Sequence, residues 1–503
     1  MGIVLKQTSK NVFIISIALV VGGINTLYFY PEFLKDKYYG LVVFLLATSN
    51  LLQPLMSLGA QHTIIKFYSS FNDKKSKDIF LSSIIFVPLL IIIPVSFLVV
   101  QIHDIIGSFL SMQNPIIESY VWVIFLVSFA TSYFEVFYAW SRVQLKSVFG
   151  NALKEVYPRL SVFILLILVY INLIKKEDFV WFLTGLYFLR LIIMILYSLS
   201  IYKPKFSFTL PLNFREILSY SLYILLAGSA ASLLIDIDKY MIPQKEAISQ
   251  TAYYAVAVFI ATVVEIPGRA MFQIINPLVA RSLNENNINE LNDLYTKSSI
   301  NLLIIAGLFF LVININIVPF YNLMSSSSYG DAIWVVLMIS LSKLILMSFG
   351  CGPAILATSK FYKITLPFSI FMAVSVYFLN DILIDIYSIN GAALSTLIVV
   401  IFFTFFKILY IKFKLDIIPY SIHTIKVLAI ILFTFFIFIG IDNDGRLFYF
   451  LFSDLEFEFS NVLEIIFNSV LVSSLYLYIV YKSKSSKSVN NFINKLLRGN
   501  FGL

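Results

Sequence analysis

Long runs of apolar residues recur along the whole chain, and they limit its fold more than any other feature. Windows of about 19 residues, the length of a helix that crosses a bilayer, locate fourteen such runs. Only 13% of the residues are charged, against about 25% in soluble domains. We therefore predict an all-α polytopic membrane protein with about 14 transmembrane helices. The predicted spans are 11–30, 39–59, 79–101, 117–139, 160–174, 179–202, 217–237, 251–277, 299–321, 332–357, 364–384, 389–411, 423–441 and 462–481.

Lysine and arginine are unevenly distributed between the segments that join these spans. With the N-terminus inside, the inside segments hold 24 of the 36 basic residues and the outside segments hold 7. Cytoplasmic loops carry such an excess, so we predict that both termini are cytoplasmic. The net charge of +8 is then a property of these loops and does not indicate a nucleic-acid partner. Lys6 and Lys10 precede the first run without a cleavage site after it, which predicts a retained helix and not a signal peptide.

Residues that could hold a metal or form disulfides are scarce. Cys351 is the single cysteine, and His62, His103 and His423 lie far apart in the sequence. Neither pattern has the spacing of a metal site or a disulfide framework. The sequence also lacks a phosphate-binding loop for ATP. We predict no metal, no cofactor and no catalytic group, so any energy for transport comes from gradients or from downstream use of the substrate.

An internal repeat predicts how the spans are grouped. The segment "YYGLVVFLLATSNLLQPLM" begins at Tyr38, and "YYAVAVFIATVVEIPGRAM" begins at Tyr253. These are the second and eighth spans, and an even spacing gives both halves the same orientation, the parallel-repeat arrangement of many transporters. We predict two six-helix bundles, residues 1–205 and 206–415, joined by the proline-broken segment 203–216. Two additional helices within 416–482 and a basic cytoplasmic tail, 483–503, which is predicted to lie on anionic lipid, complete the chain.

Several stretches resemble one family of membrane proteins. They are "LYFYPEFLKDKYYGLVVFLLATSNLLQPLMSLGA" (27–60), "DIDKYMI" (236–242), the second Tyr-Tyr span, and "LNDILIDIYSINGAALST" (379–396). In order and spacing they are similar to the O-antigen flippase (Wzx-like) branch of the multidrug/oligosaccharidyl-lipid/polysaccharide (MOP) exporter superfamily. The resemblance covers nearly the whole chain. It implies a V-shaped, MATE-like helical transporter in the bacterial inner membrane with a central polar cavity.

The same resemblance implies the substrate and the partners. The expected substrate is a polyprenyl-diphosphate-linked oligosaccharide, a repeat unit of O-antigen, and so of lipopolysaccharide, or of another surface polysaccharide. The family moves such units from the cytoplasmic to the outer leaflet. Coupling to H+ or Na+, contacts with membrane lipids and a polysaccharide polymerase as partner are further expectations.

Charged residues inside predicted spans are the candidate binding residues, because each costs about 2.5–3.5 kcal/mol at mid-membrane unless it is buried in protein or faces a wet cavity. Glu265 and Arg269 lie one helical turn apart. They are either an intrahelical ion pair that lowers its own insertion cost or part of a cavity wall. Pro267 and Gly268 between them predict a kink or hinge, which favours the cavity. A guanidinium there suits a diphosphate, since it can grip two phosphate oxygens.

Other polar residues in the spans are weaker candidates. Arg190 suits either the substrate or a structural ion pair, and Glu135 suits either pairing with Arg190 or taking up a coupling cation. Lys343 could reach the cytoplasmic surface instead of a cavity. Asn25 and Asn50 could bind sugar hydroxyls or, more simply, join helices. A last group at the outer end of the seventh span suits interface anchoring: Asp236, Asp238 and Lys239.

Two other functions fit the same sequence. The first is a cation-coupled multidrug exporter of the same superfamily, which a single acidic site would favour over paired cations. The second is a membrane-embedded glycan polymerase or ligase. Such enzymes usually have a large outer loop with catalytic residues, whereas the longest predicted outer loop here, 442–461, holds acids and one arginine, Arg446. The sequence therefore favours a transporter.

Overall fold

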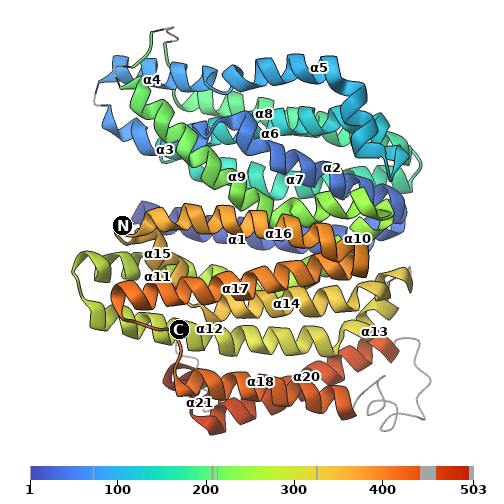
Figure 1. Cartoon of the computed structure of the whole chain (residues 1–503), viewed down its shortest axis with the longest axis vertical. Coiled ribbons are helices and arrows are strands. Elements are labelled where there is room, and N and C mark those ends of the chain that lie inside the picture. Colours follow the sequence, from blue (N-terminus) through green and yellow to red (C-terminus); the bar gives the residue numbers. More distant parts are fainter. Residues whose placement is uncertain are drawn as a thin grey trace. The chain divides into compact units, whose positions relative to one another are not determined.

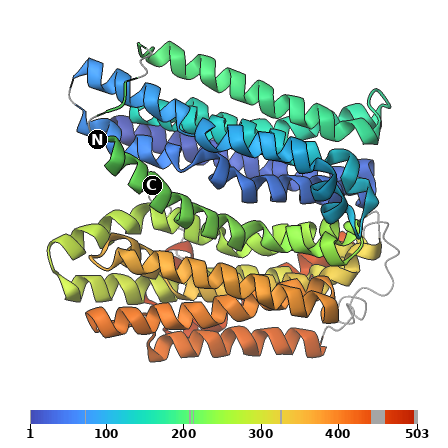
Figure 2. The same cartoon turned by 45° about the horizontal axis from the view of Figure 1, so that its top comes forward.

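The computed structural model describes residues 2–71, 73–205, 209–211, 213–324, 327–441 and 460–497. Every regular element within these ranges is a helix, which confirms the predicted all-α class. The chain divides into two compact units, residues 1–255 (unit 1) and 256–503 (unit 2). Figures 1 and 2 show that the long helices of each unit lie side by side along a common direction.

Unit 1 begins at the N-terminus and ends inside a helix that continues into unit 2. The predicted linker segment, residues 203–216, lies within unit 1. The division into bundles 1–205 and 206–415 stays a prediction. The elements of unit 1 are α1 (Gly2–Ile24), η1 (Asn25–Leu34), α2 (Lys35–Ser57), α3 (Ala60–Phe67), η2 (Tyr68–Ser70), α4 (Lys74–Phe86), α5 (Leu89–Ser111), η3 (Pro115–Tyr120), α6 (Val121–Val143), α7 (Ser147–Tyr170), α8 (Lys176–Ile201), α9 (Phe214–Lys245) and the first part of α10 (Ile248–Thr262).

The helix α2 packs against α6 and α9, and a glycine lets the start of α10 approach it. A Cβ atom on Gly40 would lie 1.9 Å from the carbonyl oxygen of Ile248, so only glycine fits there. Buried Asn114 fixes the same corner. Its amide nitrogen donates to the carbonyl oxygens of Pro243 (2.7 Å) and Glu246 (2.8 Å), and its Oδ1 accepts from the Ile248 N–H at 2.9 Å. The turn between α9 and α10 is thereby tied to unit 1.

Unit 2 contains the rest of the chain. Its elements are the end of α10, η4 (Val263–Glu265), α11 (Ile266–Asn284), α12 (Ile288–Ile315), α13 (Ile317–Asn322), η5 (Ser327–Ala332), α14 (Ile333–Ser348), α15 (Gly352–Thr358), η6 (Tyr362–Ile364), α16 (Thr365–Tyr387), α17 (Ile389–Leu415), α18 (Ile422–Ile441), α20 (Ser460–Ser483) and α21 (Lys487–Leu497). In the basic tail, α21 covers part of the predicted surface segment, and residues 498–503 lie outside the described ranges.

The helix α12 is central to unit 2, where α11, α14, α18 and α20 pack against it. Gly307 makes room on α12, since a Cβ atom there would lie 2.5 Å from Cδ1 of Ile431 on α18. The hydroxyl of buried Tyr476 on α20 donates to the carbonyl oxygen of Ile304 at 3.0 Å. The last two long helices therefore share a hydrophobic core with α12.

Within the described residues, eleven helices are long and apolar enough to cross a membrane, or twelve when the bent α9 is included. The predicted count of fourteen is larger for two reasons. Residues 13–57 count as one continuous candidate span, although two spans are predicted there. The backbone at Lys35, between the two, is not helical, with φ 61° and ψ 169°. The fifth predicted span lies in α7, which carries Lys154, Glu155 and Arg159 and is not among those helices.

Candidate functional site

A polar cavity of about 640 Å³ lies inside unit 1. Six helices, α2, α3, α6, α7, α8 and α9, contribute its walls. Four basic and three acidic side chains line it, a net charge of +1 when all are ionised. Its lining residues are Asn50, Gln53, Gln61, His62, Ile65, Thr131, Glu135, Ala139, Arg142, Lys154, Glu155, Pro158, Arg159, Tyr187, Arg190, Ser232, Ile235 and Asp236.

Most charged groups of this cavity are already paired with a neighbour. Lys154 Nζ lies 2.7 Å from Glu135 Oε1, which joins α7 to α6. Arg159 forms an ion pair with Glu155 at 3.1 Å along α7. Each of these two acids therefore cancels one cation, and the uncancelled basic groups set the positive character of the cavity.

The third acid of the cavity, Asp236, belongs to α9. Asp236 accepts a hydrogen bond from the Asn50 amide at 3.2 Å and pairs with Lys239 at 2.8 Å. Because Asn50 is on α2, this contact joins α2 to α9. The cluster Asp236, Asp238 and Lys239 is therefore fixed by internal partners, since Asp238 also accepts a hydrogen bond from the Tyr254 hydroxyl.

Arg190 has unusual surroundings for a charged side chain. The residue is 5% exposed, and its guanidinium carbon lies 4.3 Å from the ring centre of Phe134 and 4.6 Å from that of Tyr187. Such stacking attracts a cation to the ring faces. Its Nη2 donates to the Thr131 hydroxyl at 3.3 Å, and its Nε has no acceptor among the described residues. No carboxylate of the described residues lies within ion-pair distance of Arg190. Glu135, in the same cavity, is bonded to Lys154 and attracts the guanidinium only from farther away.

A second hollow of about 470 Å³ adjoins the cavity, with Arg142, Lys154 and Glu155 lining both. It also includes Asn11 in the middle of α1 and Ser147 at the start of α7. Polar side chains therefore continue from the cavity toward the end of unit 1 at which α7 begins.

His62, on the short helix α3 outside the candidate spans, also lines the cavity. Burial lowers the pKa of His62 from its usual 6.5, the Glu135 carboxylate opposes this shift, and Arg142 and Lys154 add to it. The imidazole is therefore neutral near pH 7 and adds no charge to the cavity.

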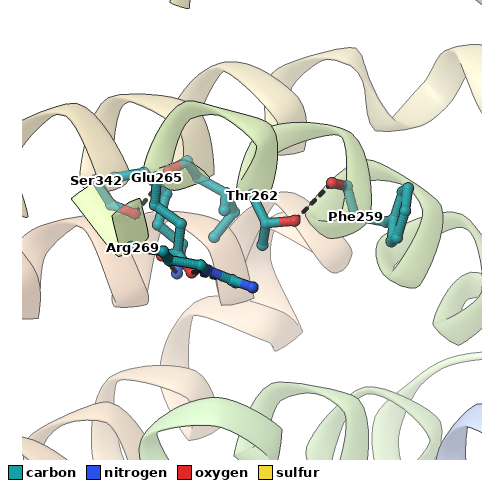
Figure 3. A network of polar contacts seen from close by, with 7 residues as sticks. Phe259, Thr262, Glu265, Arg269 and Ser342 are labelled. Carbon is teal, nitrogen blue, oxygen red and sulfur yellow. Dashed lines mark hydrogen bonds and ion pairs between the residues drawn. The ribbon is translucent and has the colours of Figure 1, made fainter. Parts of the chain in front are cut away.

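Unit 2 holds a separate ionic group around Glu265. Its Oε1 lies 2.5 Å from Arg269 Nη2, and its Oε2 lies 3.0 Å from Lys343 Nζ on α14. Figure 3 shows Glu265 and Arg269 on neighbouring turns, with the Arg269 side chain directed along the helix toward the turn of Thr262. The Arg269 side chain is 57% exposed, whereas those of Glu265 and Lys343 are 21% and 23% exposed. One carboxylate thus holds two cations.

The predicted hinge coincides with a change of helix type. The α-helix α10 ends at Thr262, a 3₁₀ turn covers Val263–Glu265, and Pro267 lies in the first turn of α11. Proline is tolerated there because the first helical N–H groups have no intrahelical acceptor. Gly268 is buried, and a Cβ atom on it would lie 2.4 Å from Met347 Sδ. Hinge motion at this place stays a prediction.

The structure brings the sequence candidates together in two groups. Glu135, Arg190, Asn50 and Asp236 line the unit 1 cavity, and Glu265 joins Arg269 and Lys343 in unit 2. Glu135 pairs with Lys154 and not with Arg190, one of the partners considered for it. Asn25 is 2% exposed and donates to the Arg159 carbonyl oxygen at 2.8 Å, so it joins two helices.

Sequence reasoning missed several cavity residues. Arg142, Lys154, Glu155 and Arg159 fall between the predicted spans 117–139 and 160–174 and are therefore not among the candidates. A usable signal exists, because Lys154, Glu155 and Arg159 lie in the helix α7 that continues into an apolar run. Charges within a helix that must enter the bilayer indicate a wet or protein-lined face.

Comparisons with known proteins give a family and a fold. A family model described as polysaccharide biosynthesis protein matches residues 8–267. The lipid II flippase MurJ, in an inward closed conformation, is 16% identical over 95% of this chain and 99% of that chain, with a TM-score of 0.69. No curated protein matches the chain significantly.

Two transporters of a second kind share the fold. An inward-facing multidrug resistance MATE family transporter of the MOP superfamily is 13% identical over 80% of this chain and 94% of that chain, with a TM-score of 0.58. A MATE solved in complex with MaL6 is 14% identical over 82% and 97%, with a TM-score of 0.54. At these identities the likeness is one of fold.

Proposed function

Because the chain belongs to the family of polysaccharide biosynthesis proteins, we propose that it is a flippase for a polyprenyl-diphosphate-linked oligosaccharide. It moves a repeat unit of O-antigen or of another surface polysaccharide from the cytoplasmic to the outer leaflet. The shared fold with a lipid II flippase supports a lipid-linked substrate. The mechanism is alternating access, in which one site is opened to each side in turn.

The observation that carries this proposal is the polar, net positive cavity among the apolar helices of unit 1. A diphosphate and its sugars lose water when they enter a membrane, so they need polar groups in place of that water. The cavity offers guanidinium and ammonium groups for the diphosphate, and the side-chain amides of Gln53 and Gln61 for sugar hydroxyls. These contacts are spread over six helices, which allows release as well as binding.

A second function is a cation-coupled multidrug exporter, favoured by the fold shared with MATE transporters. In that case Glu135 would serve as the acidic site for H+ or Na+. The pairing of Glu135 with Lys154 at 2.7 Å opposes it, because an ammonium group already occupies the place of the coupling cation.

The deciding experiment removes the protein from the cells that make it and examines the lipid-linked intermediates by mass spectrometry and leaflet accessibility. We expect complete repeat units to accumulate on the cytoplasmic leaflet with unchanged sugar composition. An incomplete glycan would indicate an enzyme such as a polymerase or ligase. Normal surface glycan with altered drug tolerance would indicate the exporter.

The orientation of the chain is a further part of the proposal. We place both termini in the cytoplasm on the 24 to 7 distribution of basic residues. Single cysteines introduced at Asp73 and Ser388, in a background without Cys351, test this by labelling with a membrane-impermeant reagent. Labelling of position 388 but not 73 from outside is expected, and the reverse result would invert the topology.

A further inference from the structure

We propose that Arg190 binds a phosphoryl group inside the unit 1 cavity. The inference deepens the proposed function, on which it rests for the identity of the lipid that carries the phosphate. Its chemistry, recognition of a phosphoryl oxyanion by a buried guanidinium, can be tested without any transport measurement.

The first step is the missing counter-charge of Arg190. The residue is 5% exposed, and a guanidinium is protonated at any physiological pH. Burying a charge is costly unless it is paired. The ring faces of Phe134 and Tyr187 and the Thr131 hydroxyl, its contacts, carry no negative charge. The Glu135 carboxylate acts on it only from beyond ion-pair distance and is bonded to Lys154. An anion that enters the cavity therefore gives Arg190 an ion-pair partner that the protein itself does not supply.

The second step is the shape of the group that fits. The guanidinium carbon lies 4.3 Å and 4.6 Å from the centres of the Phe134 and Tyr187 rings, so we expect a ligand to bind the N–H groups along the edge of the guanidinium. The Nε–H on that edge has no acceptor among the described residues. A guanidinium edge presents parallel N–H donors that match two oxygens of one phosphoryl group. A spherical anion such as chloride can use this edge less well.

The third step is the neighbouring positive charge. Arg159 lines the same cavity and is paired with Glu155 along its own helix. Lys154 is likewise held by Glu135. These two cations can bind a second phosphoryl group, but each of them would then have to interact with the phosphoryl group and with its carboxylate partner at the same time. Arg142, the remaining cation of the cavity, is exposed. Arg190 therefore ranks first among the cavity cations for the more buried phosphoryl group.

The test uses the purified full chain in lipid nanodiscs with inorganic pyrophosphate as the probe. Binding is measured by isothermal titration calorimetry, with inorganic phosphate and chloride for comparison. We expect pyrophosphate to bind more tightly than phosphate and chloride, and Arg190→Lys to weaken pyrophosphate about tenfold, because the ammonium keeps the charge but loses the planar fork. The matched control is Arg281→Lys, since Arg281 is exposed and pairs with Glu285 at 2.8 Å.

Thr131→Val provides a second variant in case Arg190→Lys disturbs folding, which ligand-free melting in the same nanodiscs will reveal. It keeps the guanidinium but removes the hydroxyl that orients it, so we expect a loss of about threefold. Equal pyrophosphate affinity in wild type, Arg190→Lys and Thr131→Val would overturn the assignment. A uniform loss that Arg281→Lys also shows would overturn it as well, because it would reflect non-specific charge.

A further arm separates a lipid headgroup from a free phosphate. Nanodiscs are prepared with and without a polyprenyl diphosphate, and competition with inorganic pyrophosphate is measured. Competition that depends on Arg190 identifies the lipid headgroup, and its absence with intact pyrophosphate binding identifies a free phosphate. If pyrophosphate binds at Arg190 but no lipid-linked unit is moved, the phosphoryl-binding role of Arg190 is upheld and the flippase proposal fails. If units move normally with Arg190→Lys, the flippase proposal is upheld and the phosphoryl-binding role of Arg190 fails.

Discussion

Arg190 in unit 1 and Arg269 in unit 2 are arginines of membrane-embedded helices with opposite surroundings. Arg269 forms an ion pair with the carboxylate of Glu265, one helical turn before it, and the Arg269 side chain is 57% exposed. Arg190 is 5% exposed, has its guanidinium carbon within 5 Å of the centres of two aromatic rings, and forms no ion pair with a carboxylate of the described residues. The positive charge of the same residue type is therefore paired with a carboxylate in unit 2 and left without an ion-pair partner in unit 1.

This difference separates structural charges from charges available to a ligand. The Glu265 carboxylate binds two cations, Arg269 and Lys343, so an anionic ligand would compete with an existing partner. At Arg190 a ligand displaces no carboxylate. We therefore expect substitutions at Arg190 to affect binding and transport, and those around Glu265 to affect mainly the stability of unit 2.

The largest effect is expected for Arg190→Ala. Hydrogen bonds to a charged group contribute about 1.5–3 kcal/mol, so loss of the guanidinium should reduce the rate of export roughly 100-fold. The measurement is surface glycan per membrane-inserted protein, with the protein level determined in the same membranes. Arg269→Ala is the matched comparison and should retain most of the export. Equal loss in both variants would remove the distinction between the two arginines.

The second effect concerns the ionic group of unit 2. Glu265→Gln leaves the Arg269 guanidinium and the Lys343 ammonium without their shared carboxylate. Because these groups are partly buried, we expect a loss of about 2 kcal/mol of stability, less than for a fully buried pair. Arg269→Ala should cost below about 1 kcal/mol, since an exposed ion pair contributes little.

Thermal unfolding of the purified variants checks this order. A larger loss for Arg269→Ala than for Glu265→Gln would contradict the interpretation that Glu265 is the centre of the group. Preserved stability with lost export in Arg269→Ala would instead return Arg269 to the substrate cavity, the place that the sequence favours.

The sequence predicted the ionic group of unit 2 better than the cavity of unit 1. Glu265 and Arg269 are one helical turn apart, so their contact follows from the helix repeat. The cavity joins side chains from six helices, and its key contacts span long sequence separations, such as Asn50 to Asp236. No local pattern contains that information. The all-α class was predictable because apolar length alone determines it.

The span count shows the same limit at the level of elements. The charged residues in the first half of α7 make that helix too polar to count as a membrane span, although the apolar stretch that predicts the fifth span begins at residue 160. The break at Lys35, where φ is 61°, leaves no gap in the apolar pattern of residues 13–57. A window measures composition and not backbone direction, so it cannot separate a bend from a continuous helix.

The third effect is expected from Glu135→Gln. This substitution releases Lys154 from its ion pair and raises the net charge of the cavity by one. One additional charge at an effective dielectric constant near 20 contributes on the order of 1 kcal/mol at longer range than contact. We expect pyrophosphate to bind about fivefold more tightly and more salt-sensitively, and export to slow because release is slower.

Calorimetry at two salt concentrations measures this change, and Glu285→Gln on the exposed pair with Arg281 is its control. Unchanged pyrophosphate affinity would mean that Lys154 does not face the ligand. Weaker binding would assign Glu135 a direct role in ordering the cavity.

The smallest effect is expected for His62, which faces Glu135, Arg142 and Lys154. Its pKa is lowered mainly by burial, so the folded protein binds a proton there less readily than the unfolded chain. The contribution of His62 to stability is therefore complete above its unfolded pKa of about 6.5 and is lost as the pH falls through the lower folded value.

Between pH 7 and 8 the imidazole stays neutral, and His62→Gln should export at the wild-type rate across that range. Below pH 6 the wild type should lose thermal stability that His62→Gln retains. A wild-type pH profile that shifts with His62→Gln above pH 7 would show instead that the imidazole titrates during transport.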